Sequence, residues 1–518
     1  MHTKQPWWRH GVVYQIYPRS FADSPRPDRR PGVGDLAGIA ARLDHLAWLG
    51  VDALWLSPVF RSPMADFGYD VSDYCDIDPV FGDLAAMDAL IEAAHARNIR
   101  VLLDWVPNHT SNLHPWFQES RTDRTNPKAD WYVWRDEPAT NWNASFLDHR
   151  PAWTFDPRRS QYYLHCFLPE QPDLNWDHPE VEAAMHDTLR FWLDRGVDGF
   201  RMDVVHLIGK DYADDPADAV AKGWSHVTFN DVPVTHERLR RIRALLDAYP
   251  GHRTSVGEVY LLDEQQMATY HGTADAPELH LSFNFRFLWS AWEPGALAGL
   301  ARSTSAILQA HGAPATWALS NHDVPRHRGR YGGDELDARM AAVMLLMLPG
   351  AAFLYQGEEL GLVDADVPAS RQVDPGGRDG CRAPVPWDNG PLHGWRDDPW
   401  LPFPPEADVR NVAALATDPG SILHWYRRLI DLRRTMGDAR AGTCTFLTGS
   451  PGLFAWSFRG PEGAADEWFV YVNPTAEGQD DGGRMEGATV VACTDPSVEG
   501  ATISQELPAR VAFVAHRA

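Results

Sequence analysis

Short apolar runs of strand type alternate with longer helical stretches along the first two thirds of the chain. The strand-type runs are residues 12–17, 52–58, 100–106, 199–204, 254–260, 280–285, 316–321 and 351–357. Between them, stretches such as 39–50 and 85–98 have apolar residues at helical spacing. This alternation predicts a parallel sheet covered by helices, and eight such units predict a closed (β/α)8 barrel in an α/β protein.

Two parts of the chain depart from this alternation. Residues 107–176 are rich in Trp, Pro, Asn and Asp and have few periodic apolar runs. Because a structureless loop of this length is uncommon, we expect a small inserted domain after the third strand. From residue 436 onward, strand-type runs follow one another without helices, which predicts a C-terminal antiparallel β-sandwich at 436–518. The barrel itself is then expected to comprise residues 1–106 and 177–435.

Four of the predicted strands end in an acidic residue. These are Asp104 in VLLDWVPNHT, Asp203 in VDGFRMDVVH, Glu258 in SVGEVYL and Asp323 in WALSNHDVPR. One such acid is usually a turn or helix-capping residue, but active-site residues of (β/α)8 barrels come from the carboxyl ends of several strands. Glycoside hydrolysis needs two carboxyl groups at one bond, one of them protonated. The pattern therefore predicts a sugar-cleaving site.

Within this set, Asp203 is the predicted nucleophile and Glu258 the predicted general acid and base. Arg201 precedes Asp203 by two residues, so both side chains are expected on the same side of the strand. The guanidinium should favour the ionised form of Asp203 and lower its pKa, whereas burial should raise the pKa of Glu258. A retaining mechanism predicts a separation of about 5–5.5 Å between the two carboxyl groups, and an inverting one roughly 6.5–9.5 Å.

Taken together, these motifs resemble glycoside hydrolase family 13, the α-amylase family, and within it the α-glucosidase and oligo-1,6-glucosidase branch. The resemblance also rests on HGVVYQIYPRSFADS from residue 10, QPDLNW at 171–176 and VPWDNG at 385–390. It implies a retaining, exo-acting α-glucosidase that works by double displacement. The alternatives are a transglucosylase or a sucrose isomerase with the same glucosyl-enzyme intermediate. A non-catalytic barrel of the interaction type is a further alternative.

The resemblance assigns roles to residues around the acid pair. Asp323, with His322 beside it, is expected to hold hydroxyl groups of the distorted sugar. Asp104 is expected to hold Arg201, and His109 to donate a hydrogen bond to the sugar. For the histidines, the alternative is an ordinary hydrogen-bonded core residue. A metal site is not expected, because neither HxH nor HExxH spacing occurs.

The same resemblance implies a closed end of the pocket. Tyr69 in DFGYD is expected to stack under the glucose ring, and Asp66 to bind the hydroxyls of its non-reducing end. Arg378 and Arg382 in GRDGCRAPVPWD are both candidates to pair with Asp66, and we favour Arg378. A charged pair at the pocket floor predicts a blind pocket that removes one terminal glucose at a time.

Linkage preference is expected to depend on the residue after the nucleophile. Val204 occupies that position, and in this branch Val is associated with α-1,6 linkages. His206 departs from the Val-Ile-Asn sequence common in oligo-1,6-glucosidases, and is expected to change the polarity of the acceptor site. The segment 283–289 is the expected acceptor wall. These features predict mixed specificity for maltose-type and isomaltose-type substrates, with sucrose as a further candidate.

Composition narrows the partners and the compartment. The 518 residues carry a net charge of −24, which would repel nucleic acid and anionic membranes but not a neutral sugar. The most apolar stretch, 340–356, is too short and too interrupted by Pro and Gly to span a bilayer. The N-terminus lacks the apolar segment of a signal peptide. Five scattered cysteines without CxxC spacing indicate a reducing, cytoplasmic environment.

No redox cofactor is expected, and structural Ca²⁺ is doubtful. Members of this branch often bind Ca²⁺ in an Asp- and Asn-rich loop after the first strand. Here residues 21–36 keep Asp23, Asp28 and Asp35 but are filled with Pro and Arg. Because the arginines oppose a divalent cation, no tightly held Ca²⁺ is predicted in this loop.

Overall fold

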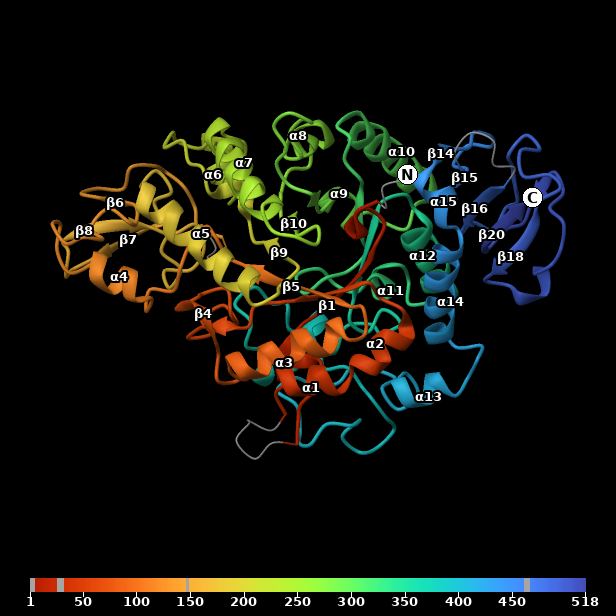
Figure 1. Ribbon diagram of the computed structural model, residues 1–518, viewed down its shortest axis with the longest axis horizontal. Helices are drawn as coiled ribbons and strands as arrows, with labels where there is room; N and C mark the ends of the chain where they lie inside the picture. The colour runs from red at the N-terminus through yellow and green to blue at the C-terminus, as the bar shows by residue number, and fades with distance from the viewer. Residues whose placement is uncertain (1–4, 26–31, 146–148, 461–465) are drawn as a thin grey trace.

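The computed structural model describes residues 5–25, 32–145, 149–460 and 466–518, and a ring of eight parallel strands lies at its centre (Figure 1). The strands are β1 (Val12–Ile16), β2 (Ala53–Leu56), β5 (Arg100–Trp105), β9 (Gly199–Met202), β10 (Thr254–Gly257), β11 (Leu281–Ser282), β12 (Thr316–Ala318) and β13 (Ala351–Tyr355). Each one lies within a run that the sequence pattern predicts as a strand.

The strands follow chain order around the ring. Their order in the sheet is β11-β10-β9-β5-β2-β1-β13-β12, so β13 pairs with β1 and joins the last strand to the first. Within the described residues, the one seam lies between β11 and β12. The predicted (β/α)8 barrel is therefore confirmed as a nearly closed ring.

Helices surround this ring. The longer ones are α1 (Leu36–Ala41), α2 (Leu43–Leu49), α3 (Leu84–His95), α5 (Pro179–Asp194), α7 (Pro233–Asp247), α10 (Pro294–Ala310), α12 (Glu335–Met347) and α14 (Ile422–Thr435). The shorter ones are α6 (Ala217–Ala221), α8 (Glu264–Thr269), α9 (Phe285–Leu288), α11 (His327–Arg330) and α13 (Val412–Ala416). The single helix expected at 39–50 is two helices, because the backbone leaves helical geometry at Arg42 (φ −106°, ψ 3°).

Side chains of the barrel strands alternate between two apolar clusters. Val13, Trp55 and Leu102 pack inside the ring, whereas Tyr14 and Leu103, on alternate positions, pack outward against the helices. This alternation follows from the two-residue period of a strand. Because both faces are covered, the strands are buried along nearly their whole length, as in other parallel sheets.

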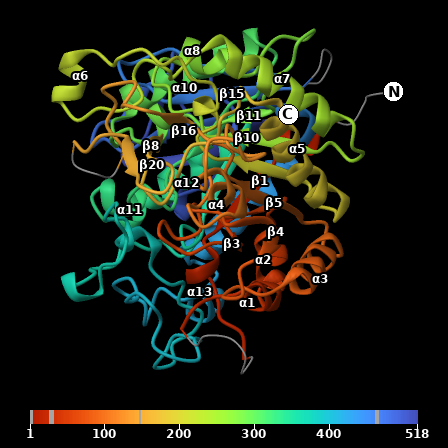
Figure 2. The same ribbon diagram turned by 90° about the vertical axis from the view of Figure 1, so that its left-hand side faces the viewer.

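The segment inserted after β5 forms a small layer at one end of the molecule (Figures 1 and 2). It contains α4 (Pro115–Ser120) and a sheet of β6 (Trp134–Arg135), β8 (Gln161–Leu164) and β7 (Trp153–Asp156), in that order. A buried ion pair ties it to the barrel: Lys210 Nζ lies 3.0 Å from Asp173 Oδ2 and donates to Asn108 Oδ1 at 2.8 Å. A short hairpin of β3 (Phe60–Arg61) and β4 (Asp73–Ile77) follows β2.

The C-terminal part is an antiparallel sheet that begins after α15 (Gly437–Ala441). The strands, in sheet order, are β14 (Thr443–Phe446), β15 (Ala455–Arg459), β16 (Glu467–Asn473), β20 (Val511–Arg517) and β18 (Thr489–Cys493). A second pair joins β17 (Gln479–Asp480) to β19 (Glu506–Leu507). Trp456 donates to the Met347 carbonyl at 3.1 Å, which fixes this sheet against the end of α12. Within the described ranges, no helix is long and apolar enough to cross a membrane.

Candidate active site

Strand register explains why three of the four acids, Asp104, Asp203 and Glu258, meet at one rim. Asp104 pairs with Arg201 across β5 and β9, and Arg201 pairs with Val256 across β9 and β10. Since alternate residues of a strand point to the same side, Asp203 and Glu258 continue the interior-facing positions of Arg201 and Val256. The carboxyl ends of these strands therefore bring the predicted nucleophile and acid together.

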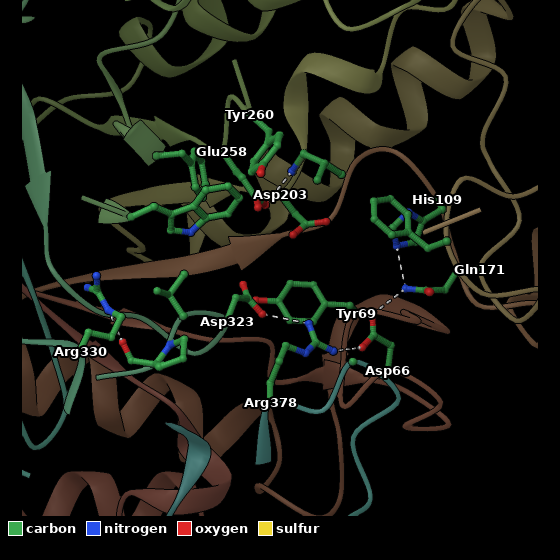
Figure 3. A pocket seen from close by; sticks show the side chains of 17 residues that line it. Asp66, Tyr69, His109, Gln171, Asp203, Glu258, Tyr260, Asp323, Arg330 and Arg378 are labelled. Atoms are coloured by element: carbon green, nitrogen blue, oxygen red, sulfur yellow. Dashed lines mark hydrogen bonds and ion pairs between the residues drawn. The ribbon is translucent and has the colours of Figure 1, made fainter. Parts of the chain in front are cut away.

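A cavity of about 550 Å³ opens at this rim (Figure 3). It is lined by Asp66, Tyr69, His109, Phe167, Gln171, Asp203, Val204, Glu258, Tyr260, Phe285, Trp289, Asp323, Val324, Pro325, Arg330, Gly376 and Arg378. Four other expected site residues, Asp104, Arg201, His322 and Arg382, are not among them. These four are buried beneath the lining residues and hold them in place.

One guanidinium binds three carboxylates at the base of the cavity. Arg201 Nη1 donates to Asp104 Oδ1 at 2.8 Å and to Asp203 Oδ1 at 2.6 Å, and Nη2 donates to Glu258 Oε2 at 2.5 Å. The backbone N–H of Val204 donates to the same Glu258 oxygen at 3.1 Å. The planar fork of the guanidinium thus fixes the positions of both catalytic candidates.

The electrostatics of Asp203 correct the expectation of a depressed pKa. Burial raises the pKa of Asp203 well above its usual value; the charge of Arg201 lowers it, and the charges of Glu258 and Asp104 raise it further. Burial also raises the pKa of Asp104 to about 6, although Arg201 opposes the shift. Closely spaced acids compete for protons, so the neighbouring carboxylates add to the effect of burial on the pKa of Asp203.

Tyr69 and His322 form a stacked pair under the cavity. Their ring centres lie 5.5 Å apart with an interplanar angle of 7°, and the Tyr69 hydroxyl lies 2.5 Å from His322 Nε2. The same hydroxyl donates to Asp104 Oδ2 at 3.1 Å, and Gln15 Nε2 contacts His322 Nδ1 at 2.8 Å. Burial lowers the pKa of His322 to about 3, so its imidazole is neutral.

The closed end of the cavity rests on a network of arginines and acids. Arg378 Nη2 lies 2.9 Å from Asp66 Oδ1, and Arg378 Nη1 lies 2.9 Å from Asp323 Oδ1. Arg382 instead contacts Asp323 at 3.2 Å and Asp374 at 3.0 Å. The favoured partner of Asp66, Arg378, is thus the one in contact with it. Asp374 also binds Arg378, at 2.7 Å, and so joins the two arginines.

Two acids of this network, Asp66 and Asp323, have opposite pKa shifts. Burial raises the pKa of Asp66 to about 6, with Arg378 and Arg382 opposing the shift. Burial also disfavours the charge of Asp323, but His322, Arg378 and Arg382 outweigh it and hold the pKa of that carboxyl well below its usual range. Asp323 is therefore ionised at neutral pH and able to accept hydrogen bonds from sugar hydroxyls.

Sequence reasoning assigned no role to Gln171 or Asp374. Gln171 Nε2 donates to Asp66 Oδ2 at 3.2 Å and lies 3.1 Å from His109 Nε2 (Figure 3). It belongs to the QPDLNW motif, which was a signal that could have identified it. Asp374 lies four residues before Arg378 in a segment without periodicity, so no helical or strand pattern predicts their contact.

Aromatic rings form the open side of the cavity. Tyr260, Phe285 and Trp289 contact one another with centroid distances of 5.1–6.3 Å, and Trp289 is 47% exposed. Phe285 and Trp289 lie in the segment expected to form the acceptor wall. The expectation for His206 is wrong: it is buried away from the cavity, where its Nδ1 lies 3.1 Å from the Glu258 carbonyl.

Two acids of the segment predicted to lack Ca²⁺, Asp23 and Asp35, have protein partners. Asp35 accepts from the Gly38 N–H and the Ser24 hydroxyl, both at 2.7 Å, as the N-cap of α1. Asp23 accepts from the Arg396 N–H at 3.2 Å, and Asp28 lies outside the described residues. Within the described ranges, no group of three or more His, Cys, Asp or Glu side chains is placed to hold a metal.

We therefore predict that chelation changes neither activity nor stability. Incubation with excess EDTA followed by gel filtration should leave kcat/KM and Tm unchanged, because the carboxylates of Asp23 and Asp35 are engaged by N–H and O–H donors. The control is the same protein with Ca²⁺ restored. A loss that Ca²⁺ reverses would contradict the prediction.

The fold and the acid pair at its rim define the class of protein, a barrel-type glycoside hydrolase. The family model "Alpha amylase, catalytic domain" matches residues 15–441. The chain belongs to this α-amylase family, glycoside hydrolase family 13.

Curated relatives and solved structures agree with this membership. The chain is 41% identical over 487 residues to a "Probable alpha-glucosidase" of Rhizobium meliloti, with 86% of each chain covered. It is 37% identical over 482 residues to an "Oligo-1,6-glucosidase" of Parageobacillus thermoglucosidasius, with 83% and 84% covered. Among solved structures, the alpha-glucosyl transfer enzyme XgtA superposes with a TM-score of 0.88 at 39% identity, over 99% of this chain and 100% of that one.

Proposed function

We propose that the protein is a retaining, exo-acting α-glucosidase that releases terminal α-glucose from short α-glucosides. The observation that carries the proposal is the Arg378–Asp66 ion pair at the closed end of a cavity that holds Asp203 and Glu258. The acid pair supplies the chemistry of bond cleavage. The ion pair limits the cavity to one sugar beyond the bond that is cut.

In the first step, a carboxylate oxygen of Asp203 attacks the anomeric carbon of the bound glucosyl unit. Glu258 gives its proton to the glycosidic oxygen as the bond from that oxygen to the anomeric carbon breaks. The products are a β-glucosyl ester of Asp203, an ionised Glu258 and the leaving sugar, which carries the transferred proton. The guanidinium of Arg201, which contacts both carboxylates, balances the negative charge that moves from Asp203 to Glu258.

In the second step, Glu258 removes a proton from water, whose oxygen attacks the anomeric carbon. The ester bond to Asp203 breaks, its electron pair returns to the carboxylate, and α-glucose leaves. Glu258 is again protonated and Asp203 ionised, so the cycle closes without a redox cofactor.

The other lining residues would position the glucosyl unit. The ionised Asp323 would accept hydrogen bonds from ring hydroxyls, and Tyr69 would supply an apolar face for the ring. Asp66 and His109, which Gln171 connects, would bind hydroxyls at the non-reducing end.

Oligosaccharides labelled at the reducing end test this arrangement. Maltotriose should lose one glucose at a time from its non-reducing end, whereas cleavage at an internal bond of longer chains would contradict a blind pocket.

A second candidate function differs only in the acceptor of the second step. The aromatic wall of Tyr260, Phe285 and Trp289, of which Tyr260 and Trp289 are exposed, offers a surface on which a sugar can stack in place of water, which favours some transfer. The structural neighbours include the trehalulose synthase MutB of Pseudomonas mesoacidophila MX-45, with a TM-score of 0.89 at 27% identity over 99% of this chain and 100% of that one. Product profiles from maltose and from sucrose separate hydrolysis, transglucosylation and isomerisation.

Val204→Thr should shift linkage preference toward α-1,4 bonds. Val204 lines the cavity beside the acid pair and has a left-handed backbone (φ 32°). Thr is β-branched like Val, so the left-handed backbone should cost both residues about the same. The substitution then changes only the polarity of one methyl-sized group. We expect both maltose and isomaltose to be hydrolysed by the parent protein. Because such a change is worth about 1–3 kcal/mol at most, the ratio of kcat/KM should move by up to about a hundredfold. An unchanged ratio would show that Val204 does not determine linkage preference.

We also propose a cytoplasmic location and a neutral sugar as the only partner that the active site requires. All five cysteines are unpaired, which fits a reducing compartment. The net charge of −24 disfavours nucleic acid and anionic membrane surfaces as partners.

A further inference from the structure

A second cavity, of about 490 Å³, lies at the end of the barrel opposite the active site. We call it the junction cavity, because the N-terminal segment, α10, the residues before β12 and β13, and the α15–β14 segment all contribute to its walls. It lies where the barrel meets the C-terminal sheet. Nothing in the proposed glucosidase mechanism uses it.

The described walls of the junction cavity carry positive charge without matching acids. Arg9, Arg302 and Arg440 line it, and Arg433 lies in the adjoining cavity. Within the described residues, none of these four arginines forms a salt bridge. Each donates to backbone carbonyl oxygens instead, at distances such as 2.7 Å for Arg440 and 2.9 Å for Arg433.

Those carbonyl groups offset only part of the charge. Arg433 and Arg440 donate to carbonyl groups at the carboxyl end of α12, and Arg433 also donates to the His10 and Gly350 carbonyls. The Arg9 partner, Gly312, follows α10. A helix terminus carries about half a negative charge, whereas each guanidinium carries a full positive one. Asp52, which lies in the adjoining cavity, is engaged by Arg434 at 3.1 Å and by the Val12 N–H at 2.8 Å. A positive surplus therefore remains, in a protein whose net charge is −24.

Three buried polar atoms of the wall have no hydrogen-bond partner: Arg440 Nε, Ser305 Oγ and His10 Nδ1. The Arg440 side chain is itself buried, with 5% of its surface exposed. Burial, followed by the charges of Arg440, Arg433 and Arg9, lowers the pKa of His10 to about 3. Arg302 and Ser305 are three residues apart on α10 and so share one helix face. Buried donors of this kind are costly unless a ligand pairs with them.

We propose that the junction cavity binds a small phosphate ester, with the phosphoryl group held by Arg302, Arg440 and Ser305. Guanidinium groups suit the geometry and charge of phosphate oxygens. The cavity is much larger than a phosphate ion, and Ala306, Pro314 and Phe446 add apolar surface to its walls, so the organic part of the ligand has room and contacts. The site is independent of the proposed glucosidase chemistry.

Thermal melting and calorimetric titration with glucose 6-phosphate test the proposal. Inorganic phosphate, glucose and NaCl at equal ionic strength serve as comparisons. Glucose 6-phosphate at saturation should raise Tm by about 2 °C or more beyond any shift that glucose produces at the proposed active site, and NaCl should not raise it. Equal affinity for inorganic phosphate would support the anion site but overturn the requirement for an ester. No binding of either phosphate compound would overturn the proposal.

Variants then locate the site. Arg302→Gln and Ser305→Ala should each weaken binding of glucose 6-phosphate, the first by about tenfold or more, because each removes one donor. The matched control is Arg428→Gln, which removes the same charge. Arg428 is an exposed residue of α14 that lies 2.7 Å from Glu499. Arg302 is exposed on α10, so glucosidase activity should stay unchanged and report that the variant is folded. If Arg302→Gln and Arg428→Gln weaken binding of glucose 6-phosphate equally, the effect comes from the loss of net charge alone, and the proposed location of the site is wrong.

Discussion

Asp203→Asn should reduce kcat on maltose by a factor on the order of 10⁴ to 10⁶, because no other carboxylate can form the glucosyl ester. The amide is nearly isosteric, so the contact with Arg201 at 2.6 Å is retained in part and the cavity keeps its shape. The loss in kcat is measured by steady-state kinetics, with the variant present in large excess over any trace of contaminating active enzyme. Asp88→Asn, which changes an exposed acid paired with Arg195, is the matched control and should be fully active.

The same variant should not lose stability. Burial and neighbouring acids raise the pKa of Asp203 in the folded state, so its stabilising contribution is present at low pH and is lost as the pH rises through that pKa. At pH 7 a neutral Asn avoids this loss, and Tm should stay the same or increase. A large fall in Tm together with inactivity would indicate misfolding. If a folded variant kept more than about 1% of kcat, the nucleophile would have to be another residue.

Glu258→Gln should separate substrates by their leaving groups. For maltose, whose leaving hydroxyl needs a proton, kcat/KM should fall by about 10²- to 10⁴-fold. For an aryl α-glucoside with a nitrophenolate leaving group, which needs little protonation, the loss in kcat/KM should be much smaller. The comparison uses kcat/KM because this quantity reports the first irreversible step, the formation of the glucosyl ester.

Gln retains an oxygen that can accept from the Val204 N–H, which contacts Glu258 at 3.1 Å in the parent protein, so the side chain should keep its position. Glu264→Gln, which changes a glutamate that Ser303 and Thr304 contact on the outer helices, is the matched control. Equal losses on both classes of substrate would contradict the role of Glu258 as the acid.

The fold was predictable because the apolar pattern of each short segment indicates whether it forms a buried strand. The eight barrel strands each carry a run of apolar residues, and the two-residue period correctly placed Arg201 beside Asp203. The break of the helix at Arg42 was not predictable, since the residues on both sides of it favour a helix. Local pattern thus gives the existence of elements more reliably than their boundaries.

Electrostatics and irregular loops were harder to predict than the strands. The sequence shows that Arg201 is near Asp203, but not that burial outweighs its charge. Arg378 and Arg382 lie in the same irregular loop, and only the folded backbone determines that Arg378 reaches Asp66. The position of Asp374 between these arginines likewise depends on tertiary structure. These features lie where no periodic signal links sequence to geometry.

The stereochemistry of the first-formed sugar tests the central claim most directly. The ¹H NMR spectrum of the anomeric protons is recorded during the first moments of maltose or aryl α-glucoside hydrolysis, before mutarotation. Double displacement through Asp203 predicts that the newly released glucose is the α-anomer, which then equilibrates slowly toward the mixture. Initial release of β-glucose would show a single displacement by water and contradict the mechanism.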